Sequence, residues 1–350
     1  MNLELLRKLV ETSGVSGHED RIRKIVIDEL TPLVDEVRSD AMGNVIAFKR
    51  GTGRAPKGGR KKIMFAGHMD EIGFVVSYID DKGFLRFQPA GGFDPRTLMA
   101  QRVTVLGKED IPGIIGSKPV HILTEEEKKK PLQIKDYFID LGMPKERVDE
   151  LVKVGDTVTM SRRMEEIGDC LTCKTFDDRV GVFCMIEALR KAGKSRADLY
   201  IVGTTQEEVG LRGALAAASG IVPDAGIAID VTLANDVPGA SGQDEISRLG
   251  EGTSISIMNG SHISNPKLLA RMVELAERKK IKFQKDVLPR GGTDGGAIQK
   301  APGGVAVITI SIPCRYVHST VEMVNKDDVQ ATIDLLAAYI AQPGDMDYTL

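Results

Sequence analysis

The second half of the chain alternates between helix-like and strand-like segments, and this alternation constrains the fold more than any other feature. Helices are predicted at 178–192, 211–219, 266–280 and 326–341, and strands at 198–204, 225–231 and 304–311. Such alternation is typical of a mostly parallel sheet covered by helices. The opening 70 residues have the same character, with predicted helices at 2–13 and 19–34 and predicted strands at 37–41, 44–48 and 62–67.

The segment between about residues 72 and 160 has a different pattern. Its predicted strands are short and bounded by turns, at 74–79, 84–88, 102–106, 111–116 and 157–160. A charged, helix-like insert at 125–152 interrupts them. A chain of 350 residues is long enough for two domains. We therefore predict a discontinuous α/β domain of residues 1–70 and 165–350, with a mixed, mostly parallel sheet covered by helices, and an inserted small β-rich domain of residues 71–164.

Composition excludes several classes of protein. The chain is 42% hydrophobic and 28% charged, with a net charge of -3, so it lacks the basic surplus of a nucleic-acid-binding protein. The basic run from Lys57 to Lys62 is broken by glycine and predicts a solvated loop rather than a phosphate-binding patch. No apolar run approaches a membrane span, and the amphipathic N-terminus does not resemble a signal peptide. We expect a cytoplasmic protein without nucleic-acid or membrane partners.

The cysteines are expected to be reduced structural thiols, as is usual in the cytosol. Cys170 and Cys173 have C-x-x-C spacing, but no second such pair or neighbouring histidine pair completes a zinc site. Cys184 and Cys314 stand alone.

Two adjacent glutamates, Glu207 and Glu208, lie between the strand at 198–204 and the helix at 211–219. Carboxylates so close repel one another, which disfavours their ionised forms. Either basic side chains or a bound cation must offset this charge.

Other candidate ligands occur at the same kind of position. In an open α/β sheet, ligands bind beyond the carboxyl ends of the strands. At predicted strand ends or helix starts lie His68 and Asp70, Asp177 and Asp178, Asp230, and His318. Each alone has an ordinary explanation, such as a hydrogen-bonded histidine or a helix-capping aspartate. Together they fit two Zn²⁺ or Co²⁺ ions sharing a bridging carboxylate, and spacing alone does not choose Asp177 or Asp178 as the bridge.

This residue set predicts hydrolysis of an amide. Two metal ions roughly 3.5–4 Å apart clamp the attacking and leaving oxygens in aminopeptidases and phosphatases. One glutamate of the pair would bind metal, and the other would face the activated water. A free carboxylate there can take a proton from that water and pass it to a leaving amine.

The motifs that carry these residues resemble those of the tetrahedral (TET) aminopeptidases. The matching stretches are His68–Gly73, Phe176–Gly181, Gln206–Gly213, Ala228–Asp230, Arg290–Asp294 and Val317–Ser319. The resemblance covers essentially the whole chain. It implies a zinc-exopeptidase-like fold and a zinc- or cobalt-dependent aminopeptidase acting on peptides. The family includes glutamyl and deblocking aminopeptidases, and some of its members have been labelled endoglucanases.

The resemblance also implies a role for each site residue. Asp177 bridges both metal ions, His68 and Asp230 complete one site, and Glu208 and His318 complete the other. Glu207 is the general acid/base. Asp70 orients His68, as metal-bound histidines usually require. The family favours Asp177 over Asp178 as the bridge, and in relatives the peptide between them is often cis.

Assembly is expected on two grounds. Family members assemble through the inserted domain into dimers and then into hollow dodecameric, tetrahedral shells. A β-rich domain also has edge strands that need a partner or cover.

Other polar residues are not expected to bind metal. His18, His121 and His262 are predicted in structural or loop roles, and Arg96 is predicted to pair with Asp94 or lie at an interface. Thr293 and Asp294 are placed near the substrate's amino terminus by the resemblance.

Two alternative functions remain open at this stage. One is a glycoside hydrolase, which needs two carboxylates flanking a sugar bond and usually no transition metal. The other is a non-catalytic, peptide-binding homologue, although no motif residue is missing. The preferred N-terminal residue (acidic, aliphatic or basic) and the native metal also stay open.

Overall fold

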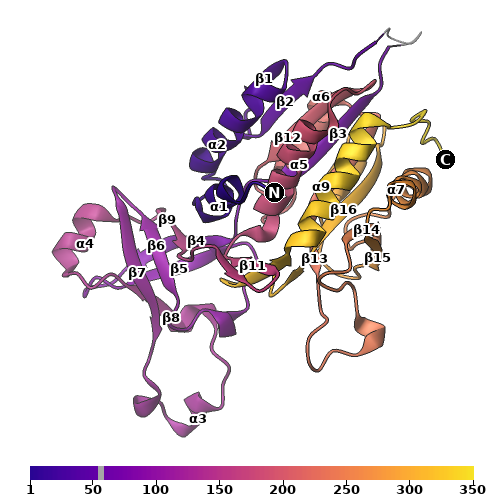
Figure 1. Cartoon of the computed structure of the whole chain (residues 1–350). Helices are drawn as coiled ribbons and strands as arrows, with labels where there is room; N and C mark the ends of the chain where they lie inside the picture. Colours follow the sequence, from indigo (N-terminus) through magenta and orange to yellow (C-terminus); the bar gives the residue numbers. More distant parts are fainter. Residues whose placement is uncertain (54–58) are drawn as a thin grey trace.

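Two bodies make up the chain in its computed structural model, which describes residues 1–53 and 59–350 (Figure 1). One is an α/β body built around a large sheet, and the other is a small closed β barrel. The predicted loop at Lys57–Lys62 falls partly outside the described residues. Lys62 itself already begins a strand, β3.

The sheet of the α/β body has the strand order β1-β2-β12-β3-β13-β16-β17-β11-β10, and β14 and β15 branch from β16. Its centre is parallel, because β12, β3, β13 and β16 pair side by side in the same direction. The strands are β1 Glu36–Ser39, β2 Val45–Lys49, β3 Lys62–His68, β10 Glu165–Ile167, β11 Cys170–Cys173, β12 Asp198–Thr204, β13 Ala225–Leu233, β14 Thr253–Met258, β15 Phe283–Val287, β16 Ala306–Arg315 and β17 Glu322–Asn325.

Helices cover both faces of this sheet, which confirms the predicted fold class. Helices α1, α5, α7 and α9 lie over one face, and α6 and α8 over the other (Figure 1). Their bounds are α1 Leu3–Glu11, α2 Asp20–Leu30, α5 Phe176–Ala192, α6 Arg212–Ile221, α7 Pro266–Lys279, α8 Asp294–Gln299 and α9 Lys326–Ala341, with 3-10 turns η1 Thr31–Leu33 and η5 Gly242–Asp244.

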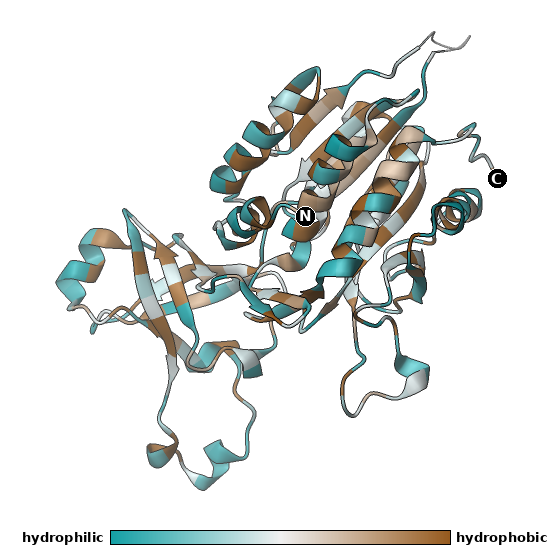
Figure 2. Cartoon of the chain, viewed as in Figure 1, coloured by the Kyte–Doolittle hydropathy of each residue, from teal (hydrophilic) through white to brown (hydrophobic). Residues whose placement is uncertain are grey.

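The alternation of side chains along β3 shows why both faces must be covered. Ile63 and Phe65 belong to the apolar core beneath α5 and α9, whereas Met64 and Ala66 belong to the core beneath α6 and α8. Successive strand residues point to opposite faces, so an apolar run can only be buried between two layers of helices. Apolar residues accordingly follow the strands and the inward helix faces (Figure 2).

Asparagine side chains cap the starts of two of the long helices. Asn265 accepts hydrogen bonds from the backbone N–H groups of Lys267 and Leu268 at the start of α7, and Pro266 occupies the first helical position. Asn325 caps α9 in the same way through the N–H of Asp327. These caps satisfy donors that have no partner within the helix.

The barrel has the strand order β4-β5-β8-β7-β6-β9 and contains its own apolar core. Phe74 and Phe87 meet inside it with ring centroids 4.6 Å apart. The strands are β4 Gly73–Ile79, β5 Leu85–Ala90, β6 Arg102–Leu106, β7 Asp110–Ser117, β8 Tyr137–Asp140 and β9 Thr157–Met160. The short helical segments are η2 Pro95–Thr97, η3 Val120–Ile122, α3 Glu125–Lys128, η4 Ile134–Asp136 and α4 Lys145–Leu151.

Two expectations for this region are wrong. The segment 125–152 is not mainly helical, because it contains the strand β8, which fills the gap between β5 and β7. The six described strands of the barrel close on themselves and leave no open sheet edge among them. The barrel therefore has no unpaired edge strand that would need a second chain as cover. The predicted domain limits at residues 70 and 165 stay predictions.

Glu71 joins the barrel to the α/β body. This carboxylate is 2% exposed and accepts hydrogen bonds from the backbone N–H of Gly14 and from the hydroxyl of Thr159 on β9. It also pairs with Lys174, just before α5. One buried side chain thus links the N-terminal segment, the barrel and the start of α5.

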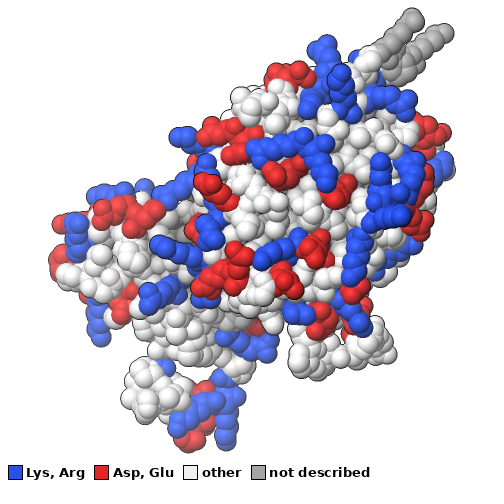
Figure 3. All heavy atoms as spheres, viewed as in Figure 1, with Lys and Arg blue, Asp and Glu red and all other residues white. Residues whose placement is uncertain are grey.

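The outer surface is mixed in charge. Acidic and basic side chains are interspersed over the face seen in Figure 3. Within residues 1–53 and 59–350, no helix combines the length and the apolar character that a membrane span needs.

Candidate metal centre

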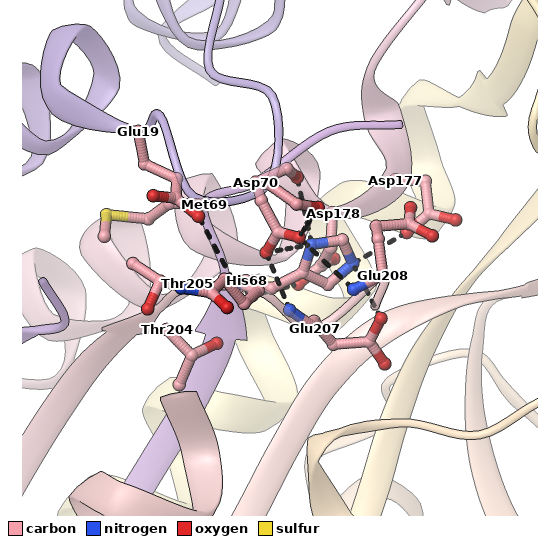
Figure 4. A network of polar contacts seen from close by, with 12 residues as sticks. Glu19, His68, Met69, Asp70, Asp177, Asp178, Thr204, Thr205, Glu207 and Glu208 are labelled. Atoms are coloured by element: carbon pink, nitrogen blue, oxygen red, sulfur yellow. Dashed lines mark hydrogen bonds and ion pairs between the residues drawn. The ribbon is translucent and has the colours of Figure 1, made fainter. Parts of the chain in front are cut away.

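The candidate ligands come together at the carboxyl edge of the parallel strands. Figure 4 shows His68, Asp177 and the two glutamates there. His68 is the last residue of β3, and it lies opposite Thr204, the last residue of β12. Asp230 lies on β13, the strand on the other side of β3. The loop after β12 then brings Glu207 and Glu208 over the end of β3. Because the strands are parallel, loops distant in the sequence converge at one edge.

The ligand atoms form two groups that share Asp177. His68, Asp177 and Asp230 make one group, and Asp177, Glu208 and His318 make the other, each with its ligand atoms within 4.8 Å of one another. His68 Nε2 is 3.0 Å from Asp177 Oδ1. His318 Nε2 is 3.3 Å from Asp177 Oδ2 and 3.4 Å from Glu208 Oε2. The two oxygens of Asp177 therefore face different groups.

Asp178 faces away from these groups. Its side chain accepts hydrogen bonds from the backbone N–H groups of His68, at 3.2 Å, and Gly181, at 3.1 Å. The Asp177–Asp178 peptide bond is cis, as the resemblance leads one to expect. The fold thus separates two adjacent aspartates that spacing could not distinguish, with Asp177 directed at the histidines and Asp178 at the backbone.

Asp70 holds the glutamate loop as well as His68. Its carboxylate accepts hydrogen bonds from the backbone N–H groups of Glu207 and Glu208, at 3.0 and 3.2 Å, and from the Ser16 hydroxyl, at 2.6 Å. His68 Nδ1 is 3.0 Å from the backbone carbonyl of Asp70 and 3.5 Å from its carboxylate. Orientation of His68 by Asp70 thus involves mainly the carbonyl oxygen, while the carboxylate positions the loop.

Glu207 lies beside both groups without belonging to either. Its Oε2 is 4.0 Å from His68 Nε2. Burial raises the pKa of Glu207 well above its ordinary value, and the negative charges of Asp230, Asp294 and Glu208 add to this effect. A carboxyl group with a raised pKa holds a proton more readily than an ordinary one, as a general acid/base must.

The electrostatics of the other residues fit a bound dication. Burial and the charge of Asp177 raise the pKa of Glu208 to about 7. Burial alone would lower the pKa of His318, but the hydrogen bond to Asp177 and the charge of Glu208 raise it to about 10. The ligand groups contain more carboxylates than histidines, and a divalent cation would neutralise this surplus of negative charge. Imidazole and carboxylate donors are also the ligands that zinc and cobalt accept.

Glu322 is a site residue that the sequence analysis missed. It begins β17 and is 1% exposed. Its two oxygens accept hydrogen bonds from the backbone N–H of Asp177, at 3.0 Å, and from that of His318, at 2.9 Å. One carboxylate thus fixes the backbone of two candidate ligands. The only signal in the sequence is an acidic residue four positions after His318.

Several other predicted residues belong to neither ligand group. His18 and His121 are exposed. Arg96 pairs with Asp94 on the surface at 2.6 Å, which is one of the two arrangements expected for Arg96. His262 is buried beside Thr309, and burial lowers its pKa to about 4. Thr293 caps α8, and Asp294 accepts a hydrogen bond from Thr204, so both lie inside the fold.

An α/β sheet with two histidine–carboxylate groups at its carboxyl edge defines the chain as a metallohydrolase of the exopeptidase type. Residues 43–335 match the M42 glutamyl aminopeptidase family. The chain belongs to this family, and its activity is the metal-dependent removal of residues from the N-termini of peptides.

Named relatives agree with this assignment. A lysyl aminopeptidase of Pyrococcus furiosus is 38% identical over 99% of each chain. The solved structure of aminopeptidase APDkam598 from Desulfurococcus kamchatkensis is 41% identical, with a TM-score of 0.93 over 99% of this chain and 95% of that one. The TET1 peptidase of Pyrococcus horikoshii, described as able to assemble into a tetrahedron or a large octahedral shell, is 33% identical, with a TM-score of 0.85 over 97% and 98%.

The glycoside hydrolase alternative has little support. A Thermotoga maritima structure described as an endoglucanase is 29% identical, with a TM-score of 0.79 over 96% of both chains. That word describes the relative alone. The present chain brings two histidines into its carboxylate groups, whereas glycosidases use paired carboxylates without such ligands.

Proposed function

We propose that the aminopeptidase reaction uses two divalent ions per chain, Zn²⁺ or Co²⁺, with Asp177 as the bridging ligand. His68 and Asp230 hold one ion, and Glu208 and His318 hold the other. The observation that carries this proposal is that each oxygen of Asp177 faces a different histidine, at 3.0 and 3.3 Å. A carboxylate that only bound one ion would not need a histidine on both sides.

Glu207 is the proposed general acid/base. When bound, the two ions supply an activated water and polarise the scissile carbonyl. Glu207 takes up a proton on its carboxylate from that water and delivers it to the nitrogen of the leaving amine. Asp70 keeps Glu207 in place, because it accepts hydrogen bonds from the backbone N–H groups of both Glu207 and Glu208.

Metal removal and addition test this function. Dialysis against EDTA should abolish hydrolysis of aminoacyl-p-nitroanilides, and adding Zn²⁺ or Co²⁺ should restore it. A titration of the metal-free protein should saturate at two ions per chain. Full activity after EDTA, with no response to either ion, would rule out the metallopeptidase mechanism. Saturation at one ion would exclude the shared-Asp177 arrangement while leaving the activity in place.

We also propose that the chain assembles with copies of itself. The Pyrococcus horikoshii TET1 peptidase forms a tetrahedron or an octahedral shell and resembles this chain along nearly its full length. Large apolar side chains on the barrel face solvent in a single chain, among them Ile114, Val120 and Ile122, at 53%, 58% and 64% exposed. Exposed apolar residues in one region mark surfaces that bind other proteins. The cytoplasmic location stays a prediction from the sequence.

A further inference from the structure

A cavity of about 270 Å³ opens directly beside the candidate metal ligands. It lies between the end of β13, the loop after β15 and the turn that carries His318. Its lining consists of Asp177, Asp230, Val231, Thr232, Leu233, Leu288, Arg290, Gly291, Gly292, Val317 and His318. The shared ligand Asp177 lines the cavity together with one further ligand of each group, Asp230 and His318. A peptide whose scissile bond lies at the metals therefore places a neighbouring side chain here.

The walls of the cavity away from the ligands are mainly apolar. Val231 and Leu288 are 7% and 9% exposed, so their side chains are packed into fixed positions. Leu233 and Val317 complete the apolar wall, and Leu233 is 41% exposed. The volume is just below the range of roughly 300–1,000 Å³ typical of pockets for whole ligands, and it suits a single side chain.

Apart from the ligand His318, Arg290 is the one positively charged side chain among the described residues that line the cavity. It is exposed, and in the described part of the chain its guanidinium forms no ion pair. The carboxylates that line the cavity, Asp177 and Asp230, belong to the metal groups. Asp286 accepts a hydrogen bond from Ser254, is 2% exposed and does not line the cavity, and burial raises its pKa.

We propose that this cavity receives the side chain of the substrate's N-terminal residue and selects an uncharged apolar side chain of the size of Leu or Met. This inference rests on the proposed aminopeptidase site and names the substrate class of that site. The apolar wall stabilises a Leu or Met side chain by removing it from water.

Charged side chains fit the cavity less well. An ammonium or carboxylate group would lose water against Val231 and Leu288, and the buried polar group that it would meet in return is the neutral hydroxyl of Thr232. Arg290 additionally repels a lysine side chain. Its attraction for a glutamate side chain is weakened because an exposed guanidinium is screened by solvent and salt. The expected order of preference is therefore Leu and Met, then Glu, then Lys.

A panel of p-nitroanilides of Leu, Met, Glu and Lys, assayed with the Zn²⁺- or Co²⁺-loaded protein, tests this order. We expect kcat/KM for Leu to exceed that for Glu and for Lys by roughly tenfold or more, as hydrophobic pockets discriminate at this level. Equal or faster cleavage of the Lys or the Glu substrate would overturn the proposal. Failure to cleave any of the substrates with either metal would instead contradict the proposed function.

Substitution of Arg290 separates charge from shape. Arg290→Glu should raise the Lys:Leu ratio of kcat/KM by about tenfold at low salt, and this gain should shrink as ionic strength rises from about 0.05 M to about 0.5 M. Arg163→Glu is the matched control, because Arg163 is also exposed but does not line the cavity. It should leave the ratio unchanged. A ratio in Arg290→Glu within twofold of the original would overturn the role of Arg290.

A second variant tests the apolar wall. Leu233→Asp changes a side chain that is already 41% exposed, so folding should be little affected. We expect a roughly tenfold lower kcat/KM for Leu and a higher Lys:Leu ratio, since the wall loses apolar surface and gains a negative charge. An unchanged preference in this variant would show that the N-terminal side chain binds elsewhere.

Discussion

Glu207 and Glu208 are adjacent in the sequence, but the fold gives them different surroundings. Glu208 Oε2 is 3.4 Å from His318 in one ligand group. Glu207 belongs to neither group, and its raised pKa marks a carboxyl group that is able to carry a proton. With the proposed roles, a cation neutralises Glu208 and Glu207 carries a proton, which limits the repulsion between the two buried carboxylates.

Glu207→Gln should remove proton transfer and leave metal binding intact. Gln is almost the same size but cannot take up a proton, so we expect turnover to fall by at least about 10²-fold with unchanged metal content. Single-turnover rates and metal analysis of the same sample measure both effects. Glu126→Gln, on an exposed part of the barrel, serves as the control. Near-normal turnover would exclude Glu207 as the general base.

His318→Ala should instead reduce the metal content. Removing one ligand of the second group weakens binding of that ion, and we expect the chain to retain about one metal ion fewer after gel filtration. Native mass spectrometry or elemental analysis measures this. His121→Ala, at an exposed position away from the ligands, should keep the original content. Unchanged stoichiometry in His318→Ala would mean that His318 is not a ligand.

Glu322 offers a test of backbone positioning. Glu322→Ala would leave the N–H groups of Asp177 and His318 without their shared acceptor. We expect metal affinity to fall by roughly 10–100-fold, as happens when groups that orient ligands are removed. Glu322→Gln keeps one acceptor oxygen and should recover part of the affinity, measured by competition with a chromophoric chelator. Equal affinity in the Ala variant and the original protein would contradict this role.

At the scale of elements, the strands of the parallel sheet end together, and buried charged residues join the elements around that edge. Arg179 in α5 is completely buried and donates to the backbone carbonyls of Met69, Leu9 and Thr12. Glu71 lies in the same region and holds the barrel against the body. A buried charge network of this kind is rigid only while every member keeps its partner.

Glu71→Gln should destabilise the fold at neutral pH. Burial would raise the pKa of Glu71, but the charges of Lys174 and Arg179 lower it below its ordinary value. The substitution leaves Lys174 without a carboxylate partner, and we expect a loss of about 3 kcal/mol in the free energy of unfolding. Denaturant titrations of both proteins at pH 7 measure this. Glu125→Gln on the surface is the control.

The same substitution has a predictable pH dependence. Since the folded-state pKa of Glu71 is lowered, its stabilising contribution is complete above the unfolded-state pKa of about 4.3. The contribution is lost as the pH falls through the folded-state value. The stability difference between the original protein and Glu71→Gln should therefore shrink below about pH 4. A difference that stayed constant from pH 7 to about pH 3 would contradict this assignment.

At the scale of the whole molecule, exposed apolar residues on the barrel predict self-association. Multi-angle light scattering at micromolar concentration should show a species much larger than the single chain of 38.0 kDa. The combined change Ile114→Asp and Ile122→Asp should shift the protein to smaller species, because charges would be buried in an interface. Leu215→Asp, at a 45% exposed position on α6 of the α/β body, is the control. A monomer at all concentrations would rule out assembly.

The extent to which the fold could be predicted depended on the kind of element. The central strands β3, β12 and β13 and the long helices α5 and α9 have strong local patterns, because each buries a continuous or periodic apolar surface. The short strands β10, β11 and β17 are not predicted, since three or four residues carry too little pattern. The strands β14 and β15, of six and five residues, are not predicted either. Strand β8 was hidden in a charged segment, and only its pairing with β5 and β7 makes it a strand.

The sequence by itself determined the class of chemistry, because imidazole and carboxylate groups at strand ends are the donors that divalent metals require. It identified the motifs through which the chain belongs to its family. Tertiary structure decided which groups face each other. It turns Asp177 toward two histidines and Asp178 toward the backbone, and it brings Glu322 beneath both Asp177 and His318. Side-chain direction and contacts between distant segments depend on packing in three dimensions, and no local pattern encodes them.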